Sequence, residues 1–379
     1  MKLVMAQSSL TIMGGDARIL LKIAQHYDAK IYTAEYDPKS TFPEFRELDV
    51  EVISRGATRR LLPYGRVAQG LDYGLSFYNF RVRDDYDVIN AHISPSHWVR
   101  NRNARVLWYC HTPPRDVYDL YRFRMSLKKA HQRPIHALGA AGVRMLDRKV
   151  VRKIEGIIAN SENTNGRIRQ YYGREDATVL PGGIEYEKFK PGDDRKYFIY
   201  PSRFSPNKRQ EYAIDAFRRF RRAKKGYRLV LCGPVSRDMA YHDYYDRVRA
   251  MAAGAHDVMI LKNVGEGRLR QLIADSTAVL YPPMNEDYGL VPLEAMASRK
   301  PVIAVNEGGP AMTIKDEKTG FLVDSEDGMT KRMLYVAEHP KVAERIGRNG
   351  RMEVERNYSW RSFFKVFDRE ARKVASAYA

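Results

Sequence analysis

The sequence predicts an α/β protein built from two doubly wound parallel-sheet domains. Short, continuous apolar runs alternate with amphipathic segments along most of the 379 residues. Strands that are apolar throughout are typical of parallel sheets covered by helices on both faces. A chain of this length also exceeds one ordinary hydrophobic core and suits two domains of similar size.

The strand-like runs form two series, separated by a polar stretch at about 185–196. The first series is KLVMAQ, AKIYTAEY, VEVIS, YDVINAHI, ARVLWYCH, EGIIANS and ATVLP. The second series is YFIYPSR, RLVLCG, VMILKN, AVLYPP, PVIAVN and GFLVD. We therefore expect a first domain over 1–184 and a second over 185–358. A helical pattern over 359–379 follows no further strand, and we expect it to pack back on the first domain.

The segments between the strands carry helical periodicity. In QEYAIDAFRRFRRAKK, the apolar residues Tyr212, Ala213, Ala216 and Phe217 recur at the spacing of one helix face. Ligands of doubly wound domains bind beyond the carboxyl ends of the strands. The loops that follow the predicted strands are therefore where we look for functional residues.

Composition and charge narrow the function classes. The net charge of +19 favours a polyanionic partner, which is nucleic acid, an anionic membrane surface or a phosphorylated ligand. A basic surface that serves only solubility is the alternative. Cys110 and Cys232, the two cysteines, lie in apolar runs and are expected to be buried thiols in a reducing compartment. No run reaches the roughly 20 apolar residues that span a bilayer, so we expect a cytoplasmic protein.

The most informative stretch is NEDYGLVPLEAM at 285–296. Gly289 permits a tight turn, and Pro292 suits the first turn of a helix. Backbone amides at such a helix start attract phosphate oxygens. Glu286 on the loop and Glu294 one turn into the helix are then candidates to accept hydrogen bonds from sugar and ribose hydroxyls. This spacing of two glutamates also occurs by chance in many acidic helices.

Three other loops carry candidate binding residues. In IYPSRFSPNKRQE, Arg203 and Lys208 follow a predicted strand. Two cations at this place can neutralise a diphosphate. The alternative is a basic loop that is only solvated. In MGGD, Gly14 and Gly15 let the backbone approach a ligand, although two glycines alone are weak evidence. His111 ends a strand in YCHTPPR, and a single histidine there is more often structural than catalytic.

Together these segments resemble the retaining glycosyltransferases of family 4, which have the GT-B fold with two Rossmann-like domains facing a central cleft. The resemblance rests on SRFSPNKRQEYAIDAF, ANSENTNGRI, LPGGIEYEKFKP and NEDYGLVPLEAMASRKPVIAVNEGGPAMTIKDEKTGFLV. It covers nearly the whole chain and is strongest from about 155 to 325. YCHTPPRDVYDLY is similar to the branch of mannosyltransferases that assemble polysaccharides and glycolipids.

The resemblance implies a role for each candidate. Glu294 holds the nucleotide ribose and Glu286 contacts the donor sugar, while His111 contacts the transferred sugar. Arg203 and Lys208 stabilise the departing diphosphate. The loop at Gly14 and Gly15 closes over the diphosphate, and the remaining donor-binding positions are backbone amides: Asp287, Tyr288, Gly289 and Leu290.

The resemblance also implies chemistry that needs no metal and no cofactor. The expected reaction is hexosyl transfer with retention, from GDP-mannose to a glycan or a lipid-linked acceptor, and a UDP-sugar donor is the alternative. We find no Asp-x-Asp metal motif after a strand. One position departs from the family: Met312 in GGPAMT stands where a glutamate is usual, which leaves the donor sugar open.

Three other readings compete with the transferase. A nucleic-acid-binding protein would cluster basic and aromatic residues on one surface, whereas the basic residues here are spread over many helices. An NAD-dependent enzyme would need a full GxGxxG after a strand. A sugar-nucleotide epimerase of the same fold is the third alternative. It differs from a transferase because it would not release UDP or GDP in a reaction that depends on an acceptor. We therefore expect no nucleic acid partner.

One dense basic region, RFRMSLKKAHQRPIHALGAAGVRMLDRKVVRK at 122–153, interleaves ten cations with apolar residues. Such a stretch can lie on anionic lipid, where each cation contributes about 1 kcal/mol. The alternative is an ordinary solvated helix with an apolar stripe that faces the core. If it binds lipid, the protein sits peripherally on the inner face of the membrane, close to a lipid-linked acceptor.

Overall fold

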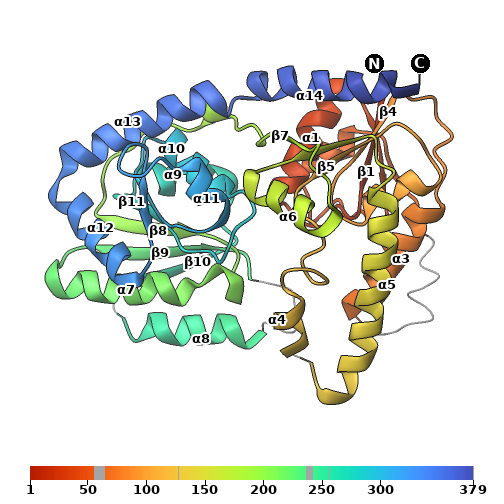
Figure 1. Cartoon of the computed structure of the whole chain (residues 1–379). Helices are drawn as coiled ribbons and strands as arrows, with labels where there is room; N and C mark the ends of the chain where they lie inside the picture. Colours follow the sequence, from red (N-terminus) through yellow and green to blue (C-terminus); the bar gives the residue numbers. More distant parts are fainter. Residues whose placement is uncertain (55–64, 127, 236–241, 256, 379) are drawn as a thin grey trace. The chain divides into compact units, whose positions relative to one another are not determined.

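The computed structural model describes residues 1–54, 65–126, 128–235, 242–255 and 257–378 (Figure 1). Leu127, within the basic region, lies outside the described residues. The chain divides into two compact units. The first unit is Met1–Gly182 together with Phe363–Ala379, and the second is Gly183–Ser362. The expected domain limits were 1–184, 185–358 and 359–379.

The first unit contains a seven-stranded sheet in the order β3-β2-β1-β4-β5-β6-β7. All its strand pairs are parallel. Its strands are β1 (Leu3–Gln7), β2 (Lys30–Thr33), β3 (Val50–Val52), β4 (Val88–Ala91), β5 (Val106–Cys110), β6 (Gly156–Ala159) and β7 (Thr178–Val179). β1, β4 and β5 are buried along their whole length because helices cover the sheet.

In the part of the chain that the structure describes, the first unit contains five α-helices and most of a sixth, and α6 shows capping residues at both ends. They are α1 (Gly15–Tyr27), α3 (Gly65–Asn79), α4 (Tyr121–Ser126), α5 (Arg133–Val151), α6 (Glu162–Tyr172) and most of α14 (Trp360–Ala375). At the start of α6, the Ser161 hydroxyl accepts a hydrogen bond from the Thr164 amide. At its end, Gly173 adopts φ 64°, which favours glycine.

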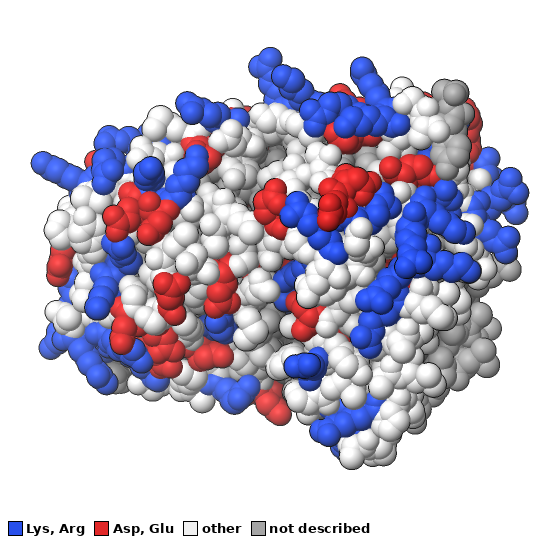
Figure 2. Space-filling view, in the orientation of Figure 1, with Lys and Arg blue, Asp and Glu red and all other residues white. Residues whose placement is uncertain are grey.

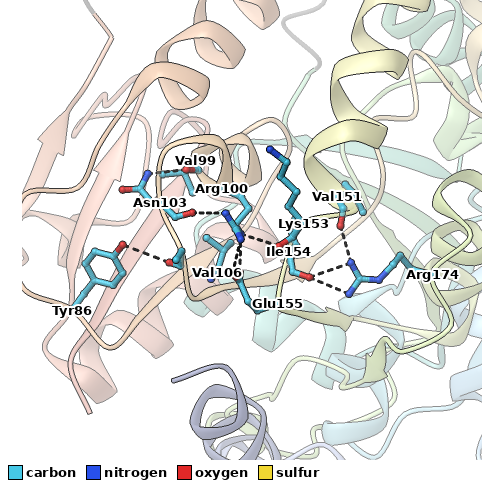
Figure 3. A network of polar contacts seen from close by, with 11 residues as sticks. Tyr86, Val99, Arg100, Asn103, Val106, Val151, Lys153, Ile154, Glu155 and Arg174 are labelled. Carbon is cyan, nitrogen blue, oxygen red and sulfur yellow. Dashed lines mark hydrogen bonds and ion pairs between the residues drawn. The ribbon is translucent and has the colours of Figure 1, made fainter. Parts of the chain in front are cut away.

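Long-range polar contacts fix the end of α5 against the sheet (Figure 3). Arg100 forms an ion pair with Glu155 at 2.8 Å and donates from Nε to Lys153 O at 2.8 Å. The Glu155 carboxylate also accepts from the Val106 amide at 2.9 Å, at the start of β5. Arg174 donates to Val151 O at 2.7 Å. The carbonyls at the helix end are thereby satisfied, and the turn into β6 is held in place.

A buried carboxylate anchors the inner face of α5. Asp147 is fully buried, and its oxygens accept hydrogen bonds from His97 Nε2 at 2.8 Å, Trp98 Nε1 at 2.8 Å and Tyr172 Oη at 2.6 Å. Burial raises the pKa of Asp147, but His97 and the hydrogen bonds outweigh burial, so its pKa is lowered. The charged form is therefore the stable one inside the unit, and this face of α5 points inward.

The second unit contains a six-stranded parallel sheet in the order β10-β9-β8-β11-β12-β13. Its strands are β8 (Tyr197–Pro201), β9 (Arg228–Gly233), β10 (Val258–Lys262), β11 (Ala278–Tyr281), β12 (Val302–Val305) and β13 (Phe321–Val323). Its helices are α7 (Gln210–Ala223), α8 (His242–Ala253), α9 (Glu266–Ala274), α10 (Leu290–Ala297), α11 (Gly308–Thr313), α12 (Glu326–Glu338) and α13 (Pro340–Asn357). α7 and α8 lie on one side of the sheet, and α9 and α10 lie on the other (Figure 1). The predicted α/β class with two parallel sheets is confirmed.

Helix α14 begins in the second unit and continues in the first. In the second unit, the Trp360 ring lies against the backbone of Gly183, where an added Cβ would be 2.7 Å from the ring. In the first unit, Phe364 stacks on His26 with ring centroids 3.8 Å apart, and Asp368 accepts a hydrogen bond from Tyr27. Aromatic packing therefore ties most of this helix to the first unit.

Both cysteines are free thiols in buried positions, as expected from the sequence. Burial raises the pKa of Cys110 well above its ordinary value and that of Cys232 to about 12, so both stay protonated at neutral pH. Across the described ranges, no helix combines the length and the apolarity needed to cross a membrane.

Candidate active site

Two loops of the second unit leave the sheet at its topological switch point. The chain runs from β8 outward through β9 to β10 and then returns to β11 on the opposite side of β8. Ligands of doubly wound sheets bind beyond the strand ends at such a point. The loops that follow are 202–209 after β8 and 282–289 after β11. They carry Arg203, Lys208 and Glu286, so the fold places the predicted residues at one edge.

An ion pair joins the two loops. Lys208 Nζ contacts Glu286 Oε2, and the two side chains are only 14% and 20% exposed. A backbone hydrogen bond from Met284 N to Asn207 O, at 2.8 Å, runs alongside. Tyr200 at the end of β8 donates its hydroxyl to Lys208 O at 2.5 Å. The cation and the carboxylate predicted separately from the sequence therefore belong to one arrangement.

Arg203 occupies the same loop but is held only through its backbone. Its carbonyl accepts a hydrogen bond from Gln210 Nε2 at 3.0 Å, while its side chain is exposed. No residue in the described part of the chain forms an ion pair with it. The neighbouring Phe204 is buried, and its amide donates a hydrogen bond to Pro234 O. The loop backbone is therefore held at Arg203 and at the next residue.

The loop 282–289 lies directly on the start of α11. The Gly309 amide donates to Glu286 O at 2.7 Å. A Cβ at Gly308 would lie 2.2 Å from Glu286 O, and one at Gly309 would lie 2.4 Å from Tyr288 O. Gly308 also adopts φ 61°. Only glycines permit this approach, so the GG of NEGGPAM determines where the acidic loop sits.

A second ion pair, which the sequence reading missed, braces the same loop. Arg209 donates from Nη2 to Glu307 Oε2 at 2.7 Å and from Nε to Pro282 O at 2.8 Å. Glu307 also accepts from the Asn285 amide at 3.0 Å. The only sequence signals are the position of Arg209 beside Lys208 and that of Glu307 before the glycines.

The expected helix start after the acidic loop is present. Gly289 is the N-cap of α10 with φ 84°, and Pro292 lies in the first turn. The Tyr288 side chain is buried in the core, so this residue offers a ligand only its backbone. The amides from Asp287 to Leu290 therefore surround the positive end of the helix, where anions are stabilised.

Both glutamates of the motif act on one buried hydroxyl. Burial raises the pKa of Tyr281 well above its ordinary value, and the charges of Glu286 and Glu294 add to the effect. Glu294 is half-buried in α10 and also raises the pKa of Cys232. The charges of both carboxylates thus act on the end of β11. Met312, at the position usually held by glutamate, is 55% exposed on α11.

The remaining predicted residues lie in the first unit. Gly14 is the N-cap of α1 and Gly15 is its first residue, directly after the loop that follows β1. An added Cβ at Gly14 would meet the Asp16 carboxylate at 2.4 Å. Asp16 in turn accepts a hydrogen bond from Gln7 Nε2 at 3.1 Å, at the end of β1. The Gly-Gly pair therefore stands at a strand end and a helix start.

His111 belongs to a buried chain of polar groups that fixes its proton. Asn90 donates from Nδ2 to Leu107 O at 3.0 Å, so its Oδ1 accepts from His92 Nε2 at 2.9 Å. His92 Nδ1 then accepts from His111 Nε2 at 2.9 Å, which leaves His111 Nδ1 unprotonated. Burial lowers the pKa of His111 to about 4 despite Asp16, so the ring is neutral at pH 7. Asn90 and His92 were not predicted as site residues, although they lie at the carboxyl end of β4.

These groups have complementary chemistry. In the second unit, cations and helix-end amides can stabilise developing negative charge, and the carboxylates can accept hydrogen bonds from hydroxyl groups. In the first unit, His111 Nδ1 can accept a hydrogen bond. Within the ranges that the structure describes, no three His, Cys, Asp or Glu side chains are grouped as metal ligands would be.

Known proteins share this architecture. Residues 14–188 match the family described as Glycosyltransferase Family 4, and residues 183–353 match the family described as Glycosyl transferases group 1. The chain is 29% identical to the alpha-1,3/1,6-mannosyltransferase ALG2 of Mus musculus, over 93% of this chain and 91% of that protein. It is 27% identical to the Schizosaccharomyces pombe protein of that name, over 90% of this chain and 74% of that one.

Solved structures share the fold. A sucrose-phosphate synthase from Thermosynechococcus elongatus has a TM-score of 0.77 at 17% identity, and all of both chains is covered. Anabaena Alr3699/HepE in complex with UDP-glucose has a TM-score of 0.75 at 18% identity, over 99% of this chain and 100% of that one. With two family matches that span residues 14–353 and two parallel-sheet units, the chain belongs to the GT-B glycosyltransferases and resembles their mannosyltransferase branch.

Proposed function

We propose that this glycosyltransferase moves mannose from GDP-mannose to a lipid-linked glycan, with retention of configuration and without a metal ion. The observation that carries the proposal is the Lys208–Glu286 pair beside the first turn of α10, at the switch point of the second unit. The similarity to alpha-1,3/1,6-mannosyltransferases over most of the chain supports mannose as the transferred sugar. GDP and retention rest on the family resemblance.

The donor would be held in the second unit. Glu294 accepts hydrogen bonds from the ribose hydroxyls, and Glu286 accepts from hydroxyls of the sugar. The amides of Asp287, Tyr288, Gly289 and Leu290 face the phosphate oxygens. The exposed guanidinium of Arg203 and the ammonium of Lys208 supply positive charge to the diphosphate.

The reaction breaks the bond between the anomeric carbon and the diphosphate oxygen. That oxygen takes up negative charge while the sugar becomes an oxocarbenium ion. An acceptor hydroxyl then attacks from the same face, forms the new glycosidic bond and gives its proton to the departing phosphate. Lys208 and Arg203 stabilise the phosphate charge as it grows, which lowers the barrier to bond cleavage. Glu286 serves as a binding group because its carboxylate is engaged in the ion pair with Lys208.

For the first unit, we propose the roles that the resemblance implies. His111 is neutral at pH 7 and unprotonated at Nδ1, so it would accept a hydrogen bond from a hydroxyl of the transferred sugar. Gly14 and Gly15 would let the backbone lie close to the diphosphate. Both roles concern binding of the donor, and neither group transfers a proton in the reaction.

We further propose that the first unit rests on an anionic membrane rather than on nucleic acid. The outward face of α5 presents Ile135, Leu138 and Met145, which are 75%, 77% and 67% exposed. Cations flank these residues in sequence: Lys128, Lys129, Arg133, Arg148, Lys149, Arg152 and Lys153. Figure 2 shows basic side chains along one part of α5 and uncharged residues beside them. In an ordinary amphipathic helix the apolar stripe faces the core. In α5 the face that carries Asp147 points inward, so this apolar stripe points away from the core.

The first test of the proposal is a donor panel in the presence of EDTA. GDP-mannose, UDP-glucose, UDP-galactose and UDP-N-acetylglucosamine are each supplied with a polyprenyl-diphosphate-linked glycan, and labelled product is measured. We expect transfer from GDP-mannose, with EDTA having no effect. Preferred use of a UDP-sugar would favour the alternative donor class. Activity that EDTA abolishes and manganese restores would contradict the mechanism.

The second prediction concerns the two cations. Arg203→Ala and Lys208→Ala should each lower kcat by about 100-fold while KM for the donor changes little, because the leaving-group charge is greatest in the transition state. Lys208→Arg, which keeps a charge beside Glu286, should retain more of the activity than Lys208→Ala. Lys331→Ala, on the exposed surface of α12, serves as the control. If both alanine variants raise KM and keep full kcat, the assigned role is wrong.

The third prediction concerns the α5 surface. In flotation with phosphatidylcholine vesicles, adding phosphatidylglycerol should bring the protein to the vesicle fraction, and salt should release it because exposed charges are screened within about 10 Å at 0.1 M. The double variant Ile135→Ser/Leu138→Ser should lose this binding. Met352→Ser removes an apolar side chain in the second unit that is 56% exposed, and this variant should keep the binding. Equal partitioning to neutral and anionic vesicles, or none at low salt, would remove the membrane proposal.

A further inference from the structure

A cavity opens at the edge of the second unit's sheet where the strands begin. It measures about 330 Å³ and lies where the chain enters β8, β11 and β12, together with the start of α13. The candidate donor loops leave the sheet at its carboxyl edge, so the two places are separated by the length of the strands. This volume falls within the range of small-molecule sites. None of the residues proposed to hold the donor lines it.

Lys300 is the unusual group in this cavity. Its side chain lines the cavity although the residue is only 9% exposed, and Nζ donates to Gly192 O at 3.1 Å. An ammonium group has three N–H donors, and this is the one hydrogen bond that Lys300 Nζ makes to the described residues. Burial lowers the pKa of Lys300, while Asp194, Asp275 and Asp193 oppose the effect. A cavity-lining ammonium with unused donors calls for a further acceptor.

Asp194, Asp275 and Asp193 act on Lys300 through their charge, but none of them forms an ion pair with it in the described part of the chain. Asp194 already accepts from Thr277 Oγ1 at 2.6 Å and from Lys196 N at 2.9 Å. Asp275 is bridged by Arg195 at 3.3 Å.

At the α13 wall of the cavity, Glu344 is paired with Arg348 at 2.9 Å. Arg299, which precedes Lys300, also lines the cavity, is exposed and has no ion pair with a described residue. Among the residues that line the cavity, three are cationic (Arg299, Lys300 and Arg348) and two are acidic (Asp194 and Glu344).

The shape and lining define the class of ligand. Arg299 supplies a planar fork and Lys300 a point charge, a combination that suits phosphate oxygens. Apolar residues, including Pro301, Val336 and Pro340, line much of the remaining wall. We propose that this cavity binds a small phosphate ester, with the phosphate on Arg299 and Lys300 and the body against the apolar wall.

The location gives the site a mechanical link to the donor loops. Lys300 comes shortly after α10 (Leu290–Ala297), whose first turn lies beside the amides assigned to the donor. Its backbone amide is bonded to Ala295 O at 2.9 Å. The Arg299 carbonyl is also packed so tightly on α13 that a Cβ at Gly347 would lie 2.0 Å away. A ligand on these two side chains therefore touches the far end of the helix that begins at the donor site.

The proposal is tested by binding to the full-length protein with GDP at saturation, so that the donor site is occupied. The probes are inorganic phosphate and mannose 6-phosphate, and mannose is the uncharged comparison. By calorimetry we expect both phosphates to bind and mannose not to. Arg299→Gln should weaken binding at least about tenfold, which corresponds to about 1.4 kcal/mol. Arg345→Gln, an exposed arginine of α13 outside the cavity, should have no effect.

A measurement on the unaltered protein guards against variants that fail to fold. Acetic anhydride modifies accessible amines, and peptide mass spectrometry reports each lysine separately. Mannose 6-phosphate should protect Lys300 and leave the exposed Lys341 of α13 unprotected. Equal labelling of Lys300 with and without the ester, or unchanged binding by Arg299→Gln, would overturn the proposal. Neither readout depends on turnover, so this result is independent of the donor assay.

Discussion

The approach of two backbone segments, at Gly308–Gly309 and at Glu286–Tyr288, is the constraint on which the candidate active site depends. A single methyl group on either glycine would overlap the opposing backbone. Because this contact fixes the loop 282–289, it also places Glu286 beside Lys208 and orients the first turn of α10. The Arg209–Glu307 pair reinforces the same position from outside. The close approach of these two glycines to the opposing backbone thus positions charges that come from three different loops.

Helix α10 connects the chemistry of the second unit. Its amino end carries the amides and the glutamate that we assign to the donor, and its carboxyl end leads into Arg299 and Lys300 at the opposite edge of the sheet. The helix is short and its core-facing residues Leu293, Ala295 and Met296 are fully buried. A rigid element of this kind transmits a displacement at one end to the other, because close-packed cores yield little to local strain.

Local patterns in the sequence were sufficient to predict the strands and to identify candidate residues at the strand ends. Continuous apolar runs predicted the strands of both sheets, and strand ends led to Arg203, Lys208, Glu286 and His111. Contacts between distant segments were not predictable in this way. Arg209 and Glu307 are 98 positions apart, and nothing in their local spacing marks them as partners. Periodicity also left two alternatives open for α5, because an apolar stripe implies burial only when the fold supplies a neighbour to cover it.

The glycine contact can be tested with one methyl group. GDP binding is measured by calorimetry for Gly309→Ala and for Gly267→Ala, a control in α9 where an added Cβ meets nothing within 4 Å. If the contact sets the donor loop, Gly309→Ala loses at least about tenfold in affinity, while Gly267→Ala binds as the parent does. Equal GDP affinity in Gly309→Ala and the parent protein would contradict the account.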